Sequence, residues 1–164
     1  MVWGCFIDDK LGPLIFIDRT VDKFTYVQVL KQNLLPFIDL LKENGVANIN
    51  FQQDNASPHR AKITMDWLQT AATQHGFTIL EFPPNSPDLN PIEHLWSIVK
   101  TELYRQYPDT MFIQGSEKAI REKLRYRINK IWWGIQDDIL KSLIDDMPKR
   151  IQAVIKAKGW YTEY

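Results

Sequence analysis

The first 45 residues carry two different hydrophobic patterns, one after the other. Two short runs rich in β-branched and aromatic residues, MVWGCFI at 1–7 and PLIFID at 13–18, flank the polar segment DDKLG. Such runs around a turn sequence predict a β-hairpin. A helix with Thr20 as N-cap should follow, and Pro36 should kink or split it. The apolar positions with helical spacing are Val27, Leu30, Leu34, Phe37, Ile38 and Leu41.

The middle of the chain shows a strand, a helix and a second strand. ANINFQQ (47–53) predicts a short strand that runs into Asp54, and FTILEF (77–82) predicts another. Between them we expect a helix with Ser57 as its cap and Pro58 at its first position. The apolar face of this helix is expected to comprise Ile63, Trp67, Leu68 and Ala71.

The remainder of the chain is predicted to be helical. A helix from about Pro91 to Tyr104 should bury Ile92, Leu95, Trp96, Val99 and Leu103. Three later stripes predict further helices: Ile120, Leu124, Ile128 and Ile131; Ile139, Leu143, Ile144 and Met147; Ile151, Val154 and Ile155. The order of elements predicts a mixed α/β domain with a helical C-terminal layer.

Composition adds few constraints. The 164 residues suit one domain, and 45% hydrophobic with 24% charged residues is an ordinary globular balance. No apolar run approaches the ~20 residues of a membrane span, no secretory signal opens the chain, and the single Cys5 excludes an internal disulfide. We therefore expect an intracellular protein without a membrane partner. Residues 1–99 carry 7 Lys and Arg against 11 Asp and Glu, while 100–164 carry 13 against 9. This asymmetry is compatible with a metal-binding N-terminal part and a C-terminal part that faces a polyanion, and it is also compatible with a chance fluctuation of four charges.

Glu93 lies in the first turn of the helix that follows the segment PPNSPDLN. Asn90, Pro91 and Glu93 match a capping box, in which the glutamate folds back onto the backbone N–H of the cap. Glu93 is also one residue, about 100° of helix rotation, from Ile92 on the buried face. From that edge a carboxylate can reach the end of a neighbouring strand. The residues alone leave both interpretations open, a cap or a metal ligand.

Asp54 directly follows a strand that is apolar enough to be central in a sheet. Ligands of open α/β sheets gather beyond the C-terminal ends of strands, whereas an Asp at such a place also commonly forms an Asx turn. Asp54 and Glu93 together can converge on Mg²⁺, which typically takes one or two carboxylates, waters and substrate phosphates. An unrelated magnesium-dependent phosphoesterase built on these two acids is therefore one alternative.

Five segments resemble the catalytic domain of Tc/mariner-type DDE transposases: VWGCF, GPLIFID, FQQDNASPHRA, PPNSPDLNPIEHLW and MPKRIQAVIKAKGWYTEY. The resemblance runs over residues 1–164, in order. It implies a ribonuclease H-like mixed sheet flanked by helices, and Mg²⁺- or Mn²⁺-dependent DNA cleavage and strand transfer. By this resemblance Asp54 is the second catalytic acid and metal ligand, and Glu93 is the third. The implied partner is DNA, as transposon ends and target. The resemblance also implies action in the nucleus and allows a homodimer.

The resemblance also implies what this chain lacks. The family's first catalytic aspartate lies on the first, central strand, upstream of the segment that corresponds to VWG. The family's helix-turn-helix DNA-binding region lies further upstream. We therefore expect a domain that is incomplete at its N-terminus, with a metal site that is weak or unoccupied and no catalysis by the chain as written. A non-catalytic DNA-binding or protein-interaction remnant, or a truncated product without a function, are the alternatives.

Four further residues are candidates for nucleic-acid contact. His59 follows Pro58 close to Asp54 and can touch a phosphate, although an exposed histidine at a helix start is the simpler interpretation. Arg121, Arg125 and Arg127 precede the Trp132–Trp133 pair, and basic residues among aromatics can hold a nucleic-acid backbone. The same arginines can equally solvate a helix whose Trp132 packs in the core.

Overall fold

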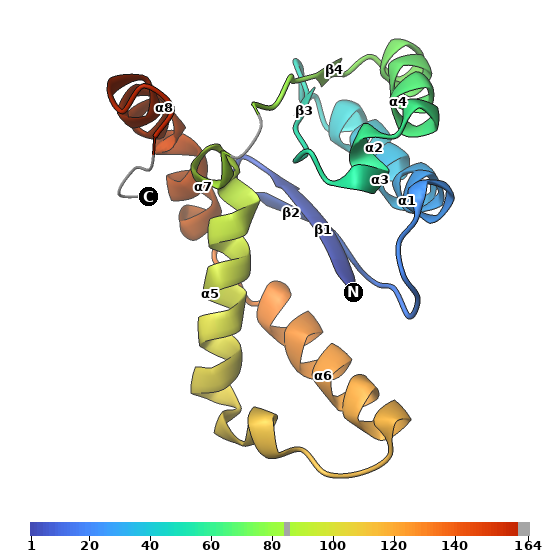
Figure 1. The fold of residues 1–164 in the computed structure, drawn as a ribbon, viewed down its shortest axis with the longest axis vertical. Coiled ribbons are helices and arrows are strands. Elements are labelled where there is room, and N and C mark those ends of the chain that lie inside the picture. Colours follow the sequence, from blue (N-terminus) through green and yellow to red (C-terminus); the bar gives the residue numbers. More distant parts are fainter. Residues whose placement is uncertain (84–85, 161–164) are drawn as a thin grey trace. The chain divides into compact units, whose positions relative to one another are not determined.

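The structure, a computed structural model, describes residues 1–83 and 86–160. The chain divides into two compact units (Figure 1). The first comprises Met1–Cys5 and Ile15–Asn90, and the second comprises Phe6–Leu14 and Pro91–Tyr164. The elements in chain order are β1 (Val2–Ile7), β2 (Lys10–Phe16), α1 (Lys23–Val29), η1 (Leu30–Leu34), α2 (Leu35–Glu43), β3 (Asn50–Phe51), α3 (Ser57–Arg60), α4 (Lys62–His75), β4 (Thr78–Ile79), η2 (Pro87–Leu89), α5 (Pro91–Gln106), η3 (Pro108–Phe112), α6 (Glu117–Trp132), α7 (Asp137–Asp145) and α8 (Met147–Lys156).

The predicted hairpin is present as β1 and β2. Its turn is shorter than expected, because β2 begins at Lys10 and only Asp8 and Asp9 lie between the strands. Asp8 adopts a left-handed backbone with φ of 50°, a conformation that aspartate tolerates better than most residues. The tight turn lets Lys10, Leu11 and Gly12 join the second strand.

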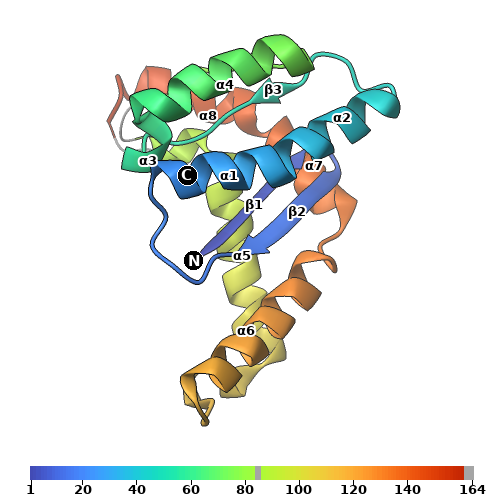
Figure 2. The same ribbon diagram turned by 90° about the vertical axis from the view of Figure 1, so that its right-hand side faces the viewer.

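The predicted first helix forms, with its start two residues later than expected. The cap is Asp22, whose carboxylate accepts the Thr25 N–H at 2.8 Å, and not Thr20. Before Pro36 the helix widens into the π-helical turn η1, closed by a bond from Leu35 N–H to Leu30 O. A proline ring clashes with the preceding turn, and the wider turn accommodates it without breaking the run. Figure 2 shows α1 continuing into α2, with α4 alongside.

The two predicted central strands pair in parallel, but both are much shorter than the sequence suggests. Asn50 of β3 is in register with Thr78 of β4, and Phe51 is in register with Ile79. The rings of Phe51 and Phe77 meet edge to face, with centroids 6.2 Å apart. Within the described part of the chain this pair and the hairpin form separate two-stranded sheets.

The helix expected after Ser57 is divided into α3 and α4. Ala61 has an extended backbone, with φ of −57° and ψ of 135°, and it ends the first helix and starts the second. Ser57 is not the cap, since Ala56 occupies that position without a side-chain bond. The predicted face of α4 is confirmed at Leu68 and Ala71 and wrong at Ile63, which is 41% exposed. The residues that α4 buries are Thr64, Leu68, Ala71 and Ala72.

In the second unit, α5 forms as predicted and packs against α6 (Figure 1). Its buried residues are Leu95, Val99 and Leu103. Trp132 of α6 is fully buried, stacks on Trp96 with ring centroids 5.2 Å apart, and donates its indole N–H to Gly12 O at 3.1 Å. Trp132 is therefore a core residue, which was one of its two interpretations.

The apolar stripe predicted for α8 is wrong. Ile151 and Ile155 are exposed, while the residue that this helix buries is Arg150. Among the described residues, no helix is both long and apolar enough to cross a membrane.

Candidate active site

Asp54 lies on the loop between β3 and α3, in the first unit. One carboxylate oxygen, Oδ1, accepts a hydrogen bond from the backbone N–H of Ala56 at 3.0 Å. This contact is the Asx turn that the sequence offered as an alternative to a metal ligand. The side chain stays 43% exposed. The turn and the functional interpretation are compatible, because the turn fixes the carboxylate without covering it.

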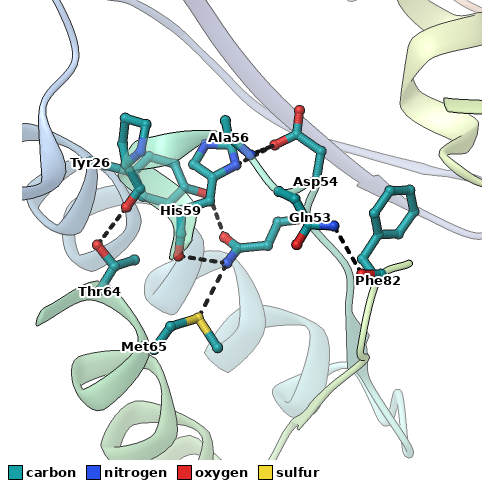
Figure 3. A network of polar contacts seen from close by, with 10 residues as sticks. Tyr26, Gln53, Asp54, Ala56, His59, Thr64, Met65 and Phe82 are labelled. Atoms are coloured by element: carbon teal, nitrogen blue, oxygen red, sulfur yellow. Dashed lines mark hydrogen bonds and ion pairs between the residues drawn. The ribbon is translucent and has the colours of Figure 1, made fainter. Parts of the chain in front are cut away.

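His59 contacts the same oxygen of Asp54. Its Nδ1 lies 2.6 Å from Oδ1 (Figure 3). A carboxylate only accepts hydrogen bonds, so Nδ1 carries the proton in this contact. The imidazole ring also stacks on Tyr26, with centroids 4.0 Å apart and planes inclined by 28°. The structure thus places the predicted candidate His59 directly beside the predicted candidate Asp54.

Tyr26 and Gln53 complete this cluster, and sequence analysis did not single out either. The buried Tyr26 hydroxyl donates to Gln53 Oε1 at 2.7 Å, and Gln53 Nε2 donates to the backbone oxygen of His59 at 3.4 Å and approaches Met65 Sδ at 4.0 Å. Burial raises the pKa of Tyr26 well above its usual value, so the hydroxyl stays protonated and remains a donor. The only sequence clue was a tyrosine next to the apolar stripe of its helix, a buried ring that needs a polar partner for its tip.

Two amides tie the Asp54 loop to the chain beyond β4. Asn55 Nδ2 donates to Phe82 O at 2.9 Å, and Gln52 Nε2 donates to Leu89 O at 2.8 Å. Both acceptors belong to the segment that leads toward α5. Gln52 and Asn55 therefore anchor the loop that carries Asp54, and the Asp54 carboxylate lies on the exposed side of this loop.

Glu93 lies in the first turn of α5, as predicted, and its side chain is exposed. The preceding Asn90 is buried, and its N–H donates to Pro87 O at 2.9 Å. The capping box stays a prediction. Asp54 belongs to the first compact unit and Glu93 to the second, so their convergence on one cation also stays a prediction.

A contact that sequence analysis missed lies beside Glu93. Arg150 Nη1 is 2.8 Å from Nδ1 of His94. A guanidinium only donates hydrogen bonds, so Nδ1 of His94 is the acceptor and does not carry a proton. His94 thus accepts one hydrogen bond from the buried Arg150 side chain.

Arg127 is committed to a structural contact in the second unit. It is buried, donates to Asp109 Oδ2 at 2.7 Å and to Thr110 Oγ1 at 2.8 Å, and lies over the Tyr107 ring, 4.7 Å from its centroid. The guanidinium lowers the pKa of the Asp109 carboxyl. Arg127 therefore joins η3 to α6 and presents no charge to solvent.

The other two candidate arginines lie nearer the surface of α6. Arg121 is exposed and pairs with Glu117 one turn earlier, and Arg125 is half-buried. Lys118, Lys130 and the aromatic ring of Tyr126 are exposed on the same helix. Basic and aromatic side chains thus share the surface of α6, as the sequence pattern indicated.

The described residues offer a divalent cation few protein ligands. Within residues 1–83 and 86–160, no group of three or more His, Cys, Asp or Glu side chains is placed to hold a metal ion. Asp54 fits Mg²⁺ or Mn²⁺ as one hard oxygen donor, half exposed on a pinned loop. The donor set therefore suits a cation that completes its shell with waters and phosphates, and it falls short of a protein cage.

Comparison with solved structures defines the fold. The chain matches the Mos1 transposase catalytic domain, solved with Mg, with a TM-score of 0.76 and 21% identity over 99% of this chain and 75% of that one. It also matches the Mos1 transposase paired-end complex with left transposon end, with a TM-score of 0.71 and 21% identity over 99% of this chain and 44% of that one. The fold is therefore ribonuclease H-like, as predicted.

Sequence comparisons define the family. The profile of the DDE superfamily endonucleases matches residues 18–111. The transposase of transposable element Tcb1 from Caenorhabditis briggsae is 34% identical over 164 residues, and that of Tc1 from Caenorhabditis elegans is 33% identical over 165 residues. Each alignment covers 100% of this chain and 54% of the relative, so the chain spans about half the length of these relatives. The chain belongs to the DDE superfamily endonucleases, and it is similar to Tc/mariner-type transposases.

Proposed function

We propose that this chain supplies two of the carboxylate ligands of a metal-dependent DNA cleavage and strand-transfer site, Asp54 and Glu93. The observation that carries the proposal is the Asp54 loop. Its carboxylate is anchored by Ala56 N–H and His59 and stays 43% exposed, at the C-terminal side of a parallel strand. That is where ligands of α/β folds bind. The match to the DDE superfamily endonucleases supports this proposal over an unrelated phosphoesterase.

The residues of the chain would act mainly by position. Asp54 would present one fixed oxygen from a loop pinned through Gln52 and Asn55, and Glu93 would present its carboxylate from the start of α5. A divalent cation bound there would activate a water or 3′-hydroxyl and stabilise the leaving oxygen of the phosphodiester. Transposon-end and target DNA are proposed as partners, supported by the complex of Mos1 transposase with a transposon end. Nuclear action and a homodimer are proposed from the family resemblance alone.

The 164-residue chain on its own is expected not to cleave DNA. In the reaction, both the attacking and the leaving oxygen need a cation. Only two carboxylates of this chain are proposed as ligands, and a coordination shell with too few carboxylates binds such cations poorly. The measurement is nicking of a labelled oligonucleotide duplex with Mn²⁺. Wild type and Asp54→Ala should give the same background. Nicking by the wild type that Asp54→Ala abolishes would show that the chain is an active nuclease.

A second candidate is a non-catalytic DNA-binding role for α6, supported by its exposed basic and aromatic side chains. The double variant Arg121→Ala, Arg125→Ala should bind duplex DNA more weakly, and the slope of log affinity against log salt should fall by about 1–2. Arg105→Ala is a matched control, because Arg105 is also an exposed arginine with a glutamate partner, Glu102, and both residues lie on α5. Equal loss of affinity in the control would contradict a specific role for α6.

A further inference from the structure

The two oxygens of the Asp54 carboxylate have different environments. Oδ1 accepts two hydrogen bonds, from Ala56 N–H and from Nδ1 of His59, whereas no hydrogen bond to Oδ2 is found among the described residues. Figure 3 shows the second oxygen pointing away from His59. We propose that His59, itself held by Tyr26, is a positioning residue that ties Oδ1 to the protein and leaves Oδ2 as the single oxygen offered to a divalent cation. This rests on the proposed role of Asp54 as a metal ligand.

His59 is well placed for this task because its own ring is fixed. Its backbone N–H donates to Ala56 O at 2.8 Å, and its backbone oxygen accepts from Gln53 Nε2. The ring stacks on Tyr26, which is 2% exposed. The Tyr26 hydroxyl returns to Gln53, the residue before Asp54. Tyr26, Gln53, Asp54 and His59 thus form a closed set of contacts that fixes the acid and its donor together.

The same unit contains a second histidine–aspartate pair, which differs from His59 and Asp54 in its structural setting. His75 Nδ1 lies 2.7 Å from Asp39 Oδ1, and the exposures of the two side chains, 26% and 49%, are close to those of His59 and Asp54. Asp39, however, lies inside α2 and His75 near the end of α4, so this pair bridges two helices and involves no turn. It provides a control for the general cost of deleting an exposed His–Asp contact.

The expected consequence is a change in metal affinity, because a residue that hydrogen-bonds to a metal ligand affects how tightly that ligand binds. A charge-assisted bond to one oxygen restricts rotation of the carboxylate, so less rotamer freedom is lost when a cation binds the other oxygen. Removing such an outer partner typically weakens metal affinity by roughly 10-fold or more. His59→Ala should therefore weaken Mn²⁺ binding by about 10-fold, whereas His75→Ala should leave it unchanged.

Two conservative replacements separate positioning from a direct phosphate contact. An asparagine amide nitrogen occupies the place of histidine Nδ1, while a glutamine amide nitrogen reaches the place of Nε2. His59→Asn should therefore recover much of the lost Mn²⁺ affinity, and His59→Gln should not. Tyr26→Phe, which keeps the ring and removes the hydroxyl, should cost less than about 3-fold.

The experiment is a titration of the full chain with Mn²⁺, followed by electron paramagnetic resonance of the free ion, with circular dichroism melts to confirm folding. Weaker binding in His59→Ala, recovery in His59→Asn and no change in His75→Ala would support the inference. Unchanged binding in His59→Ala, with loss in Asp54→Asn, would overturn the inference and leave Asp54 as a ligand. Recovery by glutamine and not by asparagine would overturn it in favour of a contact through Nε2. Binding at millimolar Mn²⁺ that ignores Asp54→Asn, or no binding at all, would overturn both this inference and the proposed function.

Discussion

Replacing Trp132 by alanine is expected to destabilise the protein by about 3–5 kcal/mol, the usual cost of deleting a large buried aromatic side chain. The indole has no exposed surface, stacks on Trp96 and donates to Gly12 O. Alanine would leave a cavity and an unpaired carbonyl in the second unit. Urea unfolding followed by far-ultraviolet circular dichroism measures the change in the free energy of unfolding.

The neighbouring tryptophan is the natural control. Trp133 follows Trp132 directly and is 57% exposed. Trp133→Ala should change the free energy of unfolding by no more than about 0.5 kcal/mol, as for most surface replacements. Trp132→Phe should fall between the two, because it keeps a stacked ring and loses one hydrogen bond of about 1 kcal/mol. Equal destabilisation by the two alanine variants would contradict the assignment of Trp132 to the core.

Replacing Asp54 by asparagine should give the largest functional effect, the loss of most divalent-cation binding. The asparagine amide retains the size of the side chain but removes the negative charge that a hard cation needs. Asp39→Asn is the matched control, because Asp39 has the same kind of histidine partner at nearly the same distance. Mn²⁺ affinity should fall at least 10-fold in the first variant and stay unchanged in the second. Equal affinity in the two variants would exclude Asp54 as a ligand.

Much of the fold was predictable because its patterns are local. The hairpin, the irregular π-helical turn before Pro36 and the helix after Asn90 follow from turn sequences, proline chemistry and helical spacing. The prediction was poorest where tertiary contacts override local preference. Ala61 interrupts α3 and α4 with an extended backbone although alanine favours helices, and Arg150 is buried where isoleucines were expected.

The candidate site also contains residues that local sequence patterns indicated and residues that only tertiary contacts revealed. Asp54, Glu93 and His59 were named as candidates from sequence, the acids through the family motifs and His59 through its nearness to Asp54, and their roles stay predictions. Tyr26 and Gln53 were missed because their role depends on a stack and on hydrogen bonds between α1 and the Asp54 loop. Arg127 was one of the candidates for nucleic-acid contact, and only its contacts with Asp109 and Tyr107 indicate a structural role. A basic stripe in a sequence does not separate charges that face solvent from charges that join two elements.

The proposed function requires that Asp54 and Glu93 bind one cation together, which stays a prediction. Mn²⁺ broadens the nuclear magnetic resonance signals of nearby atoms, so a heteronuclear spectrum of the labelled chain at increasing Mn²⁺ reports both places at once. We expect the amides around Gln53–His59 and those around Ile92–Leu95 to broaden in parallel at the same low Mn²⁺ concentration. Asp54→Asn should abolish the broadening in both regions. Broadening of one region alone, or broadening around Glu93 that persists in Asp54→Asn, would contradict the claim.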